Sequence, residues 1–179
     1  MRVTRVKHAA KPGVCEVCPE AIEVGQPYNW IKARRGPKRS RHTTCRAFRP
    51  SDLTSNDKLS HLYSIQERIE DEVSAWRLLE STDLDSLVTA LDDAATEARE
   101  VADEYRETAD NLEQGFGHAT SQSEEIAGNG DEIEGWADEL EALSSELEPA
   151  SPDLHGWDPA AWRDSIASRI ADVVGSLPL

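Results

Sequence analysis

Four residues near the N-terminus have the types and the spacing of a metal site. Cys15 and Cys18 form a C-x2-C pair, and 23 intervening residues separate it from the H-x2-C pair of His42 and Cys45. Three thiolates and one imidazole are ligands that favour tetrahedral Zn2+. Each pair spans one tight turn, so both of its ligands can reach the same ion. Because four protein ligands leave no position for water, we expect one structural zinc ion that stabilises the fold and does not catalyse.

The cysteines also have two alternative explanations, a disulfide with one spare thiol or small buried apolar side chains. An odd number of cysteines argues against a disulfide framework. The opening residues, MRVTRVKHAAKPG, are basic and contain no apolar run of the kind found in a secretory signal. We therefore expect an intracellular protein, in the cytoplasm, nucleoid or nucleus, where reducing conditions favour metal binding at this spacing.

The elements that position these ligands can be predicted from residue type. Aromatic and β-branched residues at 28–31 predict a strand, and the Gly-Pro pair within 34–39 predicts a hairpin tip or a loop. Residues 41–48 are expected to open a short helix, on which His42 and Cys45 share a face and both meet the metal. A ligand turn, a hairpin and ligands at a helix start make a small treble-clef-like zinc finger of mixed α and β structure.

A longer pattern, C-x2-C, then I-x2-G-x2-Y-x-W, then H-x2-C, surrounds these ligands. It is carried by Cys15, Cys18, Ile22, Gly25, Tyr28, Trp30, His42 and Cys45. In these residues the chain resembles the PARP-type zinc finger over about residues 8–50. The resemblance implies zinc binding, and it implies recognition of DNA nicks or ends, which is what the finger does in that family. Nothing downstream resembles an ADP-ribosyltransferase or a ligase, so neither activity is expected.

The segment that carries the second ligand pair is strongly basic, which is a separate argument for nucleic-acid binding. Clustered cations bind phosphates mainly by releasing counterions and carry no sequence information. Trp30 and Tyr28 can stack on exposed bases. For Trp30 we favour the alternative that it fills the small core beside the metal together with Ile31, because so small a domain needs every apolar side chain. The basic cluster can instead be a solvated face or dock onto an acidic surface. The candidate nucleic-acid-binding residues are Lys32, Arg34, Arg35, Lys38, Arg39 and Arg41.

Charge divides the chain into two regions. The formal net charge is −16, but residues 1–50 hold 12 Lys+Arg against 3 Asp+Glu, whereas residues 51–179 hold 7 against 32. A basic zinc module is therefore attached to a strongly acidic body. No stretch approaches the ~20 apolar residues that a membrane span requires.

The acidic body is predicted to be helical, which makes the protein mainly α. Apolar residues recur at helical spacing over 59–79, over 84–112 as a narrow coiled-coil-like seam, and over 126–147. Two glycines at 115 and 117 separate the second and third stripes, which favours an antiparallel helical hairpin. An amphipathic helix follows, with Asp158 as its N-cap. The expected organisation is a zinc module at 1–50, a linker at 51–57, the hairpin at 58–148, a linker at 149–157 and the final helix at 158–175.

The sequence contains no catalytic set, because all three cysteines are committed to metal and the carboxylates lie where a solvated helix face needs them. We therefore expect a non-enzymatic DNA-binding protein whose acidic helices serve self-association or partner recruitment. The alternative is a protein–protein adaptor in which the zinc is purely structural. A third hypothesis is an acidic decoy that occupies a nucleic-acid-binding partner.

Overall fold

The computed structural model of this 179-residue chain describes residues 1–33, 36–147 and 158–178. Within those residues it contains five helices and five short strands, so the prediction of a mainly helical protein with a small sheet region is confirmed. The chain divides into two compact units, Met1–Tyr63 and Ser64–Leu179. The boundary falls inside helix α2 (Asp57–Leu78), whereas the sequence predicts a linker at 51–57. The linker predicted at 149–157 lies outside the described residues.

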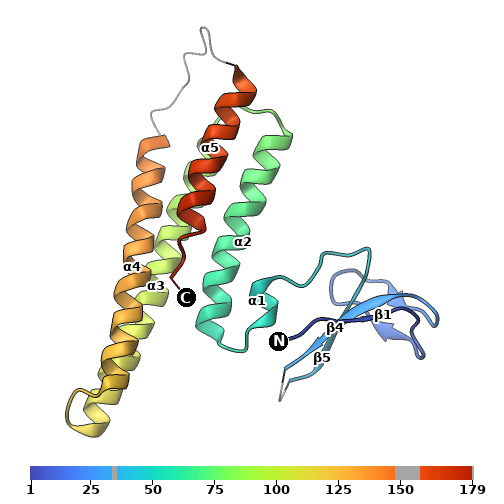
Figure 1. Cartoon of the computed structure of the whole chain (residues 1–179), viewed down its shortest axis with the longest axis horizontal. Helices are drawn as coiled ribbons and strands as arrows, with labels where there is room; N and C mark the ends of the chain where they lie inside the picture. Colours follow the sequence, from blue (N-terminus) through green and yellow to red (C-terminus); the bar gives the residue numbers. More distant parts are fainter. Residues whose placement is uncertain (34–35, 148–157, 179) are drawn as a thin grey trace. The chain divides into compact units, whose positions relative to one another are not determined.

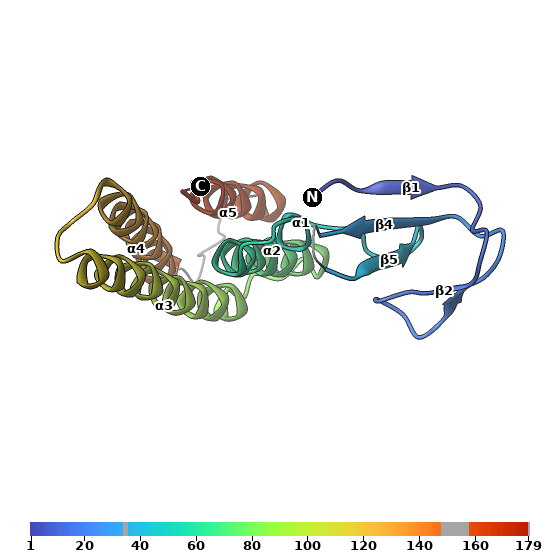
Figure 2. The same ribbon diagram turned by 90° about the horizontal axis from the view of Figure 1, so that it is seen from below.

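The first unit is built on a three-stranded antiparallel sheet, seen in Figure 2. In sheet order, its strands are β1 (Thr4–Val6), β4 (Tyr28–Lys32) and β5 (Lys38–His42). Strand β4 confirms the strand predicted at 28–31. In the β4–β5 ladder Tyr28 lies opposite His42 and Lys32 lies opposite Lys38. Since side chains alternate along a strand, these four share one face of the sheet and Ile31 and Arg41 share the other.

A two-stranded ladder holds the first ligand pair. Strand β2 (Gly13–Val14) pairs with β3 (Ala21–Ile22), and Cys15 and Cys18 lie in the connection between them. The core beneath this connection is small. It consists of buried Ala9, Cys15 and Ile22, with half-buried Cys18, Tyr28 and Cys45 packed against them.

The helix predicted at residues 41–48 is wrong. His42 is the last residue of β5, and a turn in which the Cys45 N–H donates to the His42 carbonyl at 3.2 Å brings Cys45 back beside it. The helix begins later, at α1 (Pro50–Leu53), where proline occupies the first turn and needs no hydrogen-bond partner for its nitrogen. Residues 38–42 pair with β4 in the sheet. This pairing determines their conformation, although the spacing of His42 and Cys45 is compatible with a helix.

The second unit is helical throughout its described residues, apart from the connections. Helix α3 (Asp85–Phe116) and helix α4 (Ser121–Leu147) run antiparallel and are joined by a short turn (Figure 1), as the sequence predicts. The turn begins at Gly117, whose φ of +75° suits glycine and whose N–H donates to the Glu113 carbonyl at 2.7 Å. The final helix, α5 (Pro159–Val174), starts at the predicted N-cap, where the Asp158 side chain accepts from the Ala160 N–H.

Small residues let α3 and α4 approach closely. Along α3 the buried face is rich in alanine, including Ala98 and Ala102. On α4 the buried Gly130 faces Ala102, and a Cβ added there would lie 3.0 Å from the Ala102 carbonyl oxygen. The glycine is therefore required by helix contact and not by backbone conformation.

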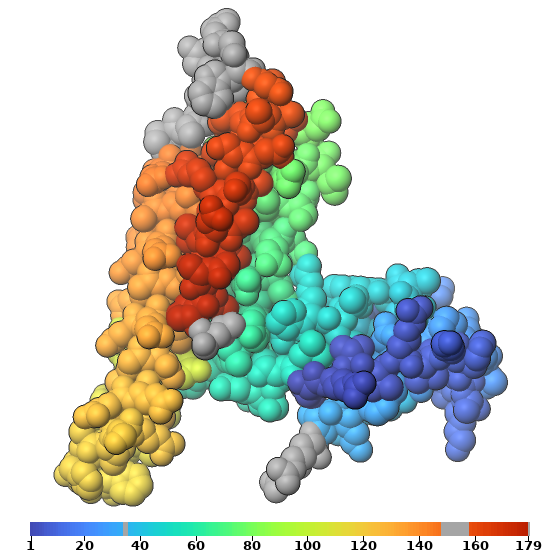
Figure 3. Space-filling model, viewed as in Figure 1, coloured from blue at the N-terminus to red at the C-terminus, as the bar shows by residue number. Residues whose placement is uncertain are grey.

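Arginines join the helices of this unit. All six arginines of residues 64–179 lie in the described part of the chain, and each bonds to an acceptor on another helix or in the connection after α2. The pairs are Arg68–Glu97, Arg77–Asp164, Arg99–Asp138, Arg106–Asp131, Arg163 with the Glu80 carbonyl, and Arg169–Glu146. In Figure 3 α5 lies along α4 and α2, and Trp136 of α4 donates its indole N–H to the Val173 carbonyl of α5 at 2.9 Å. None of the described helices is both long and apolar enough to span a membrane.

Candidate metal centre

The fold brings the four predicted ligands together from two separate segments. Cys15 and Cys18 come from the β2–β3 connection, His42 from the end of β5, and Cys45 from the turn that follows. Their ligand atoms all lie within 4.8 Å of one another, and Cys15 is buried while the other three are half-buried. Within residues 1–33, 36–147 and 158–178, this is the one group of His, Cys, Asp or Glu side chains arranged to hold a metal ion.

The distances between ligand atoms fit a tetrahedral ion. The Cys45 sulfur lies 3.8 Å from that of Cys15 and 3.7 Å from that of Cys18. Zn–S bonds of about 2.3 Å place the corners of a tetrahedron about 3.8 Å apart. A disulfide would need sulfurs about 2.05 Å apart, and all three cysteines are free. The sulfurs are thus spaced for a shared ion and not for a covalent bond.

His42 is held in the orientation that a ligand needs. Its Nδ1 lies 3.3 Å from the Cys18 sulfur and 3.9 Å from the Cys45 sulfur, so this nitrogen faces the ion. Its Nε2 lies 3.3 Å from the carbonyl oxygen of Ala21 on β3. A hydrogen bond from Nε2–H to that carbonyl leaves Nδ1 unprotonated and available to the metal.

Two of the thiols differ strongly in acidity. Burial raises the pKa of the Cys15 thiol, but backbone N–H groups, led by that of Cys18, outweigh burial and lower this pKa to about 6. Burial, together with the neighbouring sulfurs of Cys18 and Cys15, raises the pKa of Cys45 to about 11. Since three adjacent thiolates repel one another, metal binding must displace the Cys45 proton.

The candidate nucleic-acid-binding residues separate into three groups. Lys32 and Lys38 are exposed on the face of the sheet that also carries His42. Arg34 and Arg35 lie outside the described residues. Arg39 and Arg41 point to the other face, where both bond to carboxylates.

Arg39 and Arg41 form a structural ion network with Glu16 and Asp52. Arg39 donates to Glu16 at 2.9 Å and to Asp52 at 2.7 Å, and Arg41 makes two bonds to Asp52 at 2.9 and 2.8 Å. Arg41 is only 3% exposed, so it cannot reach a phosphate without leaving this network. Burial raises the pKa of Asp52, but hydrogen bonds from Arg41, the Arg49 N–H and Arg39 outweigh it and hold that pKa below its ordinary value.

Sequence reasoning missed the roles of Glu16 and Asp52. The sequence does contain a signal for Glu16. Glu16 follows the ligand Cys15, and Arg41 precedes the ligand His42. If Cys15 and His42 bind the same metal, the oppositely charged Glu16 and Arg41 are brought close together. Asp52 gives no comparable signal, because its position depends on the turn after Cys45.

The exposed face of the sheet combines cations with aromatic rings. The Lys38 ammonium lies 4.7 Å from the Tyr28 ring centre and 4.9 Å from that of Trp30, and it donates to the Tyr28 hydroxyl at 2.9 Å. A cavity of about 310 Å3 opens beside Lys38. Its lining residues include Lys11, Lys38 and Ser40 and contain no carboxylate. Lys11, Lys32 and Lys38 have no carboxylate partner among the described residues.

No protein-family model matches this chain, and comparisons with curated proteins and with solved structures also give no match.

Proposed function

We propose that this chain is a non-enzymatic zinc protein whose first unit binds nucleic acid, DNA foremost. Cys15, Cys18, His42 and Cys45 hold one structural Zn2+, and Lys32 and Lys38 contact phosphates. The acidic helices serve partner recruitment or self-association.

The observation that carries this proposal is the cationic and aromatic face of the sheet. Lys32 and Lys38 are neighbours across the β4–β5 ladder and are not neutralised by carboxylates among the described residues. Strand pairing fixes their spacing, and such uncompensated cations attract phosphates through counterion release. Because His42 lies on the same face, loss of the metal would disturb this surface. The resemblance to PARP-type fingers adds support for DNA with nicks or ends as the ligand.

A salt-titrated binding assay tests the proposal. The zinc-loaded full chain would be titrated against labelled nicked, blunt and single-stranded DNA, with fluorescence anisotropy as the readout. We expect Lys32→Ala with Lys38→Ala to weaken binding and to reduce the salt slope by about 0.9 for each lost phosphate contact on duplex DNA. Arg169→Gln is the matched control, since it removes a cation from α5 that is already paired with Glu146. Unchanged affinity and slope in the double variant would remove this face from the mechanism.

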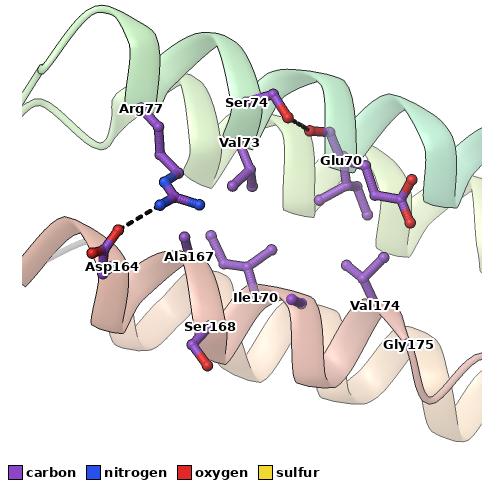
Figure 4. Close-up of a pocket in the computed structure, with 12 residues that line it drawn as sticks. Glu70, Val73, Ser74, Arg77, Asp164, Ala167, Ser168, Ile170, Val174 and Gly175 are labelled. Atoms are coloured by element: carbon purple, nitrogen blue, oxygen red, sulfur yellow. Dashed lines mark hydrogen bonds and ion pairs between the residues drawn. The ribbon is translucent and has the colours of Figure 1, made fainter.

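An adaptor role is the second candidate, and a groove between α2 and α5 favours it. The groove has a volume of about 400 Å3. Figure 4 shows Val73 of α2 pointing towards Ile170 of α5, with the Arg77–Asp164 ion pair at one end. Leu78, which is 85% exposed, lies one helical turn beyond Ser74 on the groove wall and extends its apolar rim.

The charge of the second unit indicates which partner would fit this groove. Residues 64–179 contain 30 Asp+Glu, no lysine and six arginines, all of which have internal partners. A second copy would bring the same excess of negative charge, whereas a cationic amphipathic helix offers both apolar contact and opposite charge.

A designed Leu/Lys helix of about 14 residues, roughly four turns, tests the adaptor role against a scrambled peptide of equal composition. We expect the amphipathic peptide to bind more tightly, and Ala171→Trp, which fills the groove, to abolish the difference. Ala161→Trp, on the same helix but outside the groove, is the control. Equal binding of both peptides would indicate charge attraction without a docking site.

A further inference from the structure

A second connection joins the two ligand pairs, on the side of the sheet away from the metal. Glu16 follows Cys15 in the chain, and Arg41 precedes His42. The Glu16 N–H donates to the Ser40 carbonyl at 3.0 Å, so the Cys15–Glu16 segment runs beside β5. Because adjacent residues in extended chains point to opposite sides, Cys15 and His42 meet at the metal while Glu16 and Arg41 meet behind it.

The contacts behind the metal reach both ligand segments. The Glu16 carboxylate accepts hydrogen bonds from both arginines. Arg41 donates through Nε, and Arg39 donates through its Nε at 2.9 Å and through a terminal nitrogen at 3.1 Å. Arg41 also donates to the carbonyl of Ala47, two residues after Cys45, at 2.9 Å. One guanidinium group therefore fixes the turn of the first ligand pair and the segment that leaves the second.

The burial of Arg41 makes separation of the Glu16–Arg41 ion pair unfavourable. With 3% exposure, Arg41 has little access to water and depends on Glu16 and Asp52 for its charge partners. Its guanidinium also lies 4.3 Å from the centre of the Phe48 ring, which covers one side of it. A buried charge that loses its partner is strongly unfavourable, so the pairing resists separation of the two segments even before a metal binds.

We propose that Glu16 is a positioning residue for the metal site: its ion pair with Arg41, here called the Glu16–Arg41 clasp, holds the Cys15–Cys18 turn against the strand that carries His42. The clasp pre-organises the four ligands and so increases the affinity for Zn2+. Asp52 has a different role, because it lies on α1 and anchors that helix to the same guanidinium group. This inference concerns metal affinity and does not depend on the proposed binding of nucleic acid.

Cobalt titration of the full chain tests the clasp. Co2+ in a site of three sulfurs and one nitrogen reports its geometry by absorption, and competition with a chelator gives the dissociation constant. Loss of an outer partner of a metal ligand typically weakens metal binding 10–100-fold, and we expect Glu16→Gln to weaken Co2+ binding at least about tenfold. The tetrahedral spectrum at saturation should persist, since the four ligands remain.

Glu20→Gln is the matched control. Glu20 lies two residues after Cys18, is exposed, and has no ion pair among the described residues, so it carries the same charge near the metal without a clasp. We expect it to change the affinity less than about twofold, the size of a screened surface charge effect. Equal losses in Glu16→Gln and Glu20→Gln would mean that general electrostatics acts and would overturn the positioning role.

Two further variants keep the test decisive if Glu16→Gln does not bind one Co2+ per chain. Glu16→Asp retains the charge but shortens the reach, and we expect a partial loss of affinity that is smaller than the roughly tenfold loss typical when an outer partner is removed. An unchanged affinity would overturn the clasp. Arg41→Lys should weaken binding in the wild-type background and much less in the Glu16→Gln background. Full additivity of the two changes would show that the residues act separately.

Discussion

The two units of this chain are held together by different interactions. Of the buried apolar residues in the described chain, 5 lie in Met1–Tyr63 and 24 lie in Ser64–Leu179. The first unit cannot rely on a core of that size, and it instead brings four metal ligands together and places an ion network behind them. The second unit has an apolar seam between long helices, and arginine–carboxylate pairs link the helix surfaces.

The use of arginine follows the same division. In the first unit the buried Arg41 pairs with Glu16 and Asp52. In the second unit five of the six arginines pair with exposed or half-exposed carboxylates, while Arg163 donates to the Glu80 carbonyl. Removing one partner of a buried ion pair costs about 3–5 kcal/mol, whereas an exposed pair contributes about 0–1 kcal/mol. Loss of a partner should therefore matter more for Arg41 than for the exposed arginines of the second unit. The following predictions test this contrast.

Removing the metal should have the largest effect and should be confined to the first unit. Structural zinc contributes about 10–16 kcal/mol of binding free energy in zinc-finger peptides, far more than this small core can replace. Chelation, or Cys45→Ser, should abolish hydrogen-exchange protection in β4 and β5, while the helical circular dichroism of α3 and α4 stays nearly constant. Protection of β4 that survives zinc loss would contradict this view of the first unit.

A pair of glycine substitutions tests whether close helix contact controls the second unit. Gly130→Ala places a methyl group 3.0 Å from the Ala102 carbonyl and should destabilise the unit by about 1–3 kcal/mol. Gly128→Ala, on the same helix with no heavy atom within 4 Å of its added Cβ, should stabilise it by about 0.5–1 kcal/mol. Urea unfolding followed by circular dichroism measures both, and shifts of the same sign would argue against the close approach.

Metal affinity should rise with pH, whereas the helices should respond little. At pH 7 the Cys45 thiol, with a pKa of about 11, is protonated, and the Cys15 thiol, with a pKa of about 6, is mostly ionised. Metal binding then releases the Cys45 proton, so the association constant should rise about tenfold per pH unit for that proton between about pH 6 and 8. Chelator competition at several pH values gives the slope, and a flat profile would show that Cys45 is already ionised in the free protein.

Removing a single exposed arginine from the second unit should have the smallest effect. Arg169 is 46% exposed in its side chain and pairs with Glu146, which is 62% exposed. Arg169→Gln should lower the free energy of unfolding by at most about 1 kcal/mol. A loss well above that, measured by thermal or urea unfolding, would mean that the α4–α5 link is more than a surface ion pair.

The sequence predicts which residues gather at the candidate metal site better than it predicts the elements that carry them. Cys15, Cys18, His42 and Cys45 were identifiable because metal spacing is a local pattern, and the helices over 84–147 followed from apolar periodicity. The helix expected at 41–48 was wrong because pairing with β4, a tertiary interaction, decides the conformation of residues 38–42. Local spacing does not contain that information.

The basic residues illustrate a second limit of local pattern. Lys32, Lys38, Arg39 and Arg41 are equivalent in a count of charge, but alternation along β5 places Arg41 in the interior while Lys38 stays exposed. Which cations are available to a ligand depends on the register of the hairpin and on the positions of Glu16 and Asp52. Arg34 and Arg35 lie outside the described residues and remain predictions.

Lysine is absent from residues 64–179, where every positive side chain is a guanidinium group with a partner. Acylation of amino groups, whether by an enzyme or by a chemical reagent, would therefore cancel charge at Lys32 and Lys38 and leave the links between the helices unchanged. The two units thus differ in reactivity as well as in construction. An amine-directed reagent would neutralise the exposed lysines of the first unit and leave the arginine-mediated contacts of the second unit unmodified.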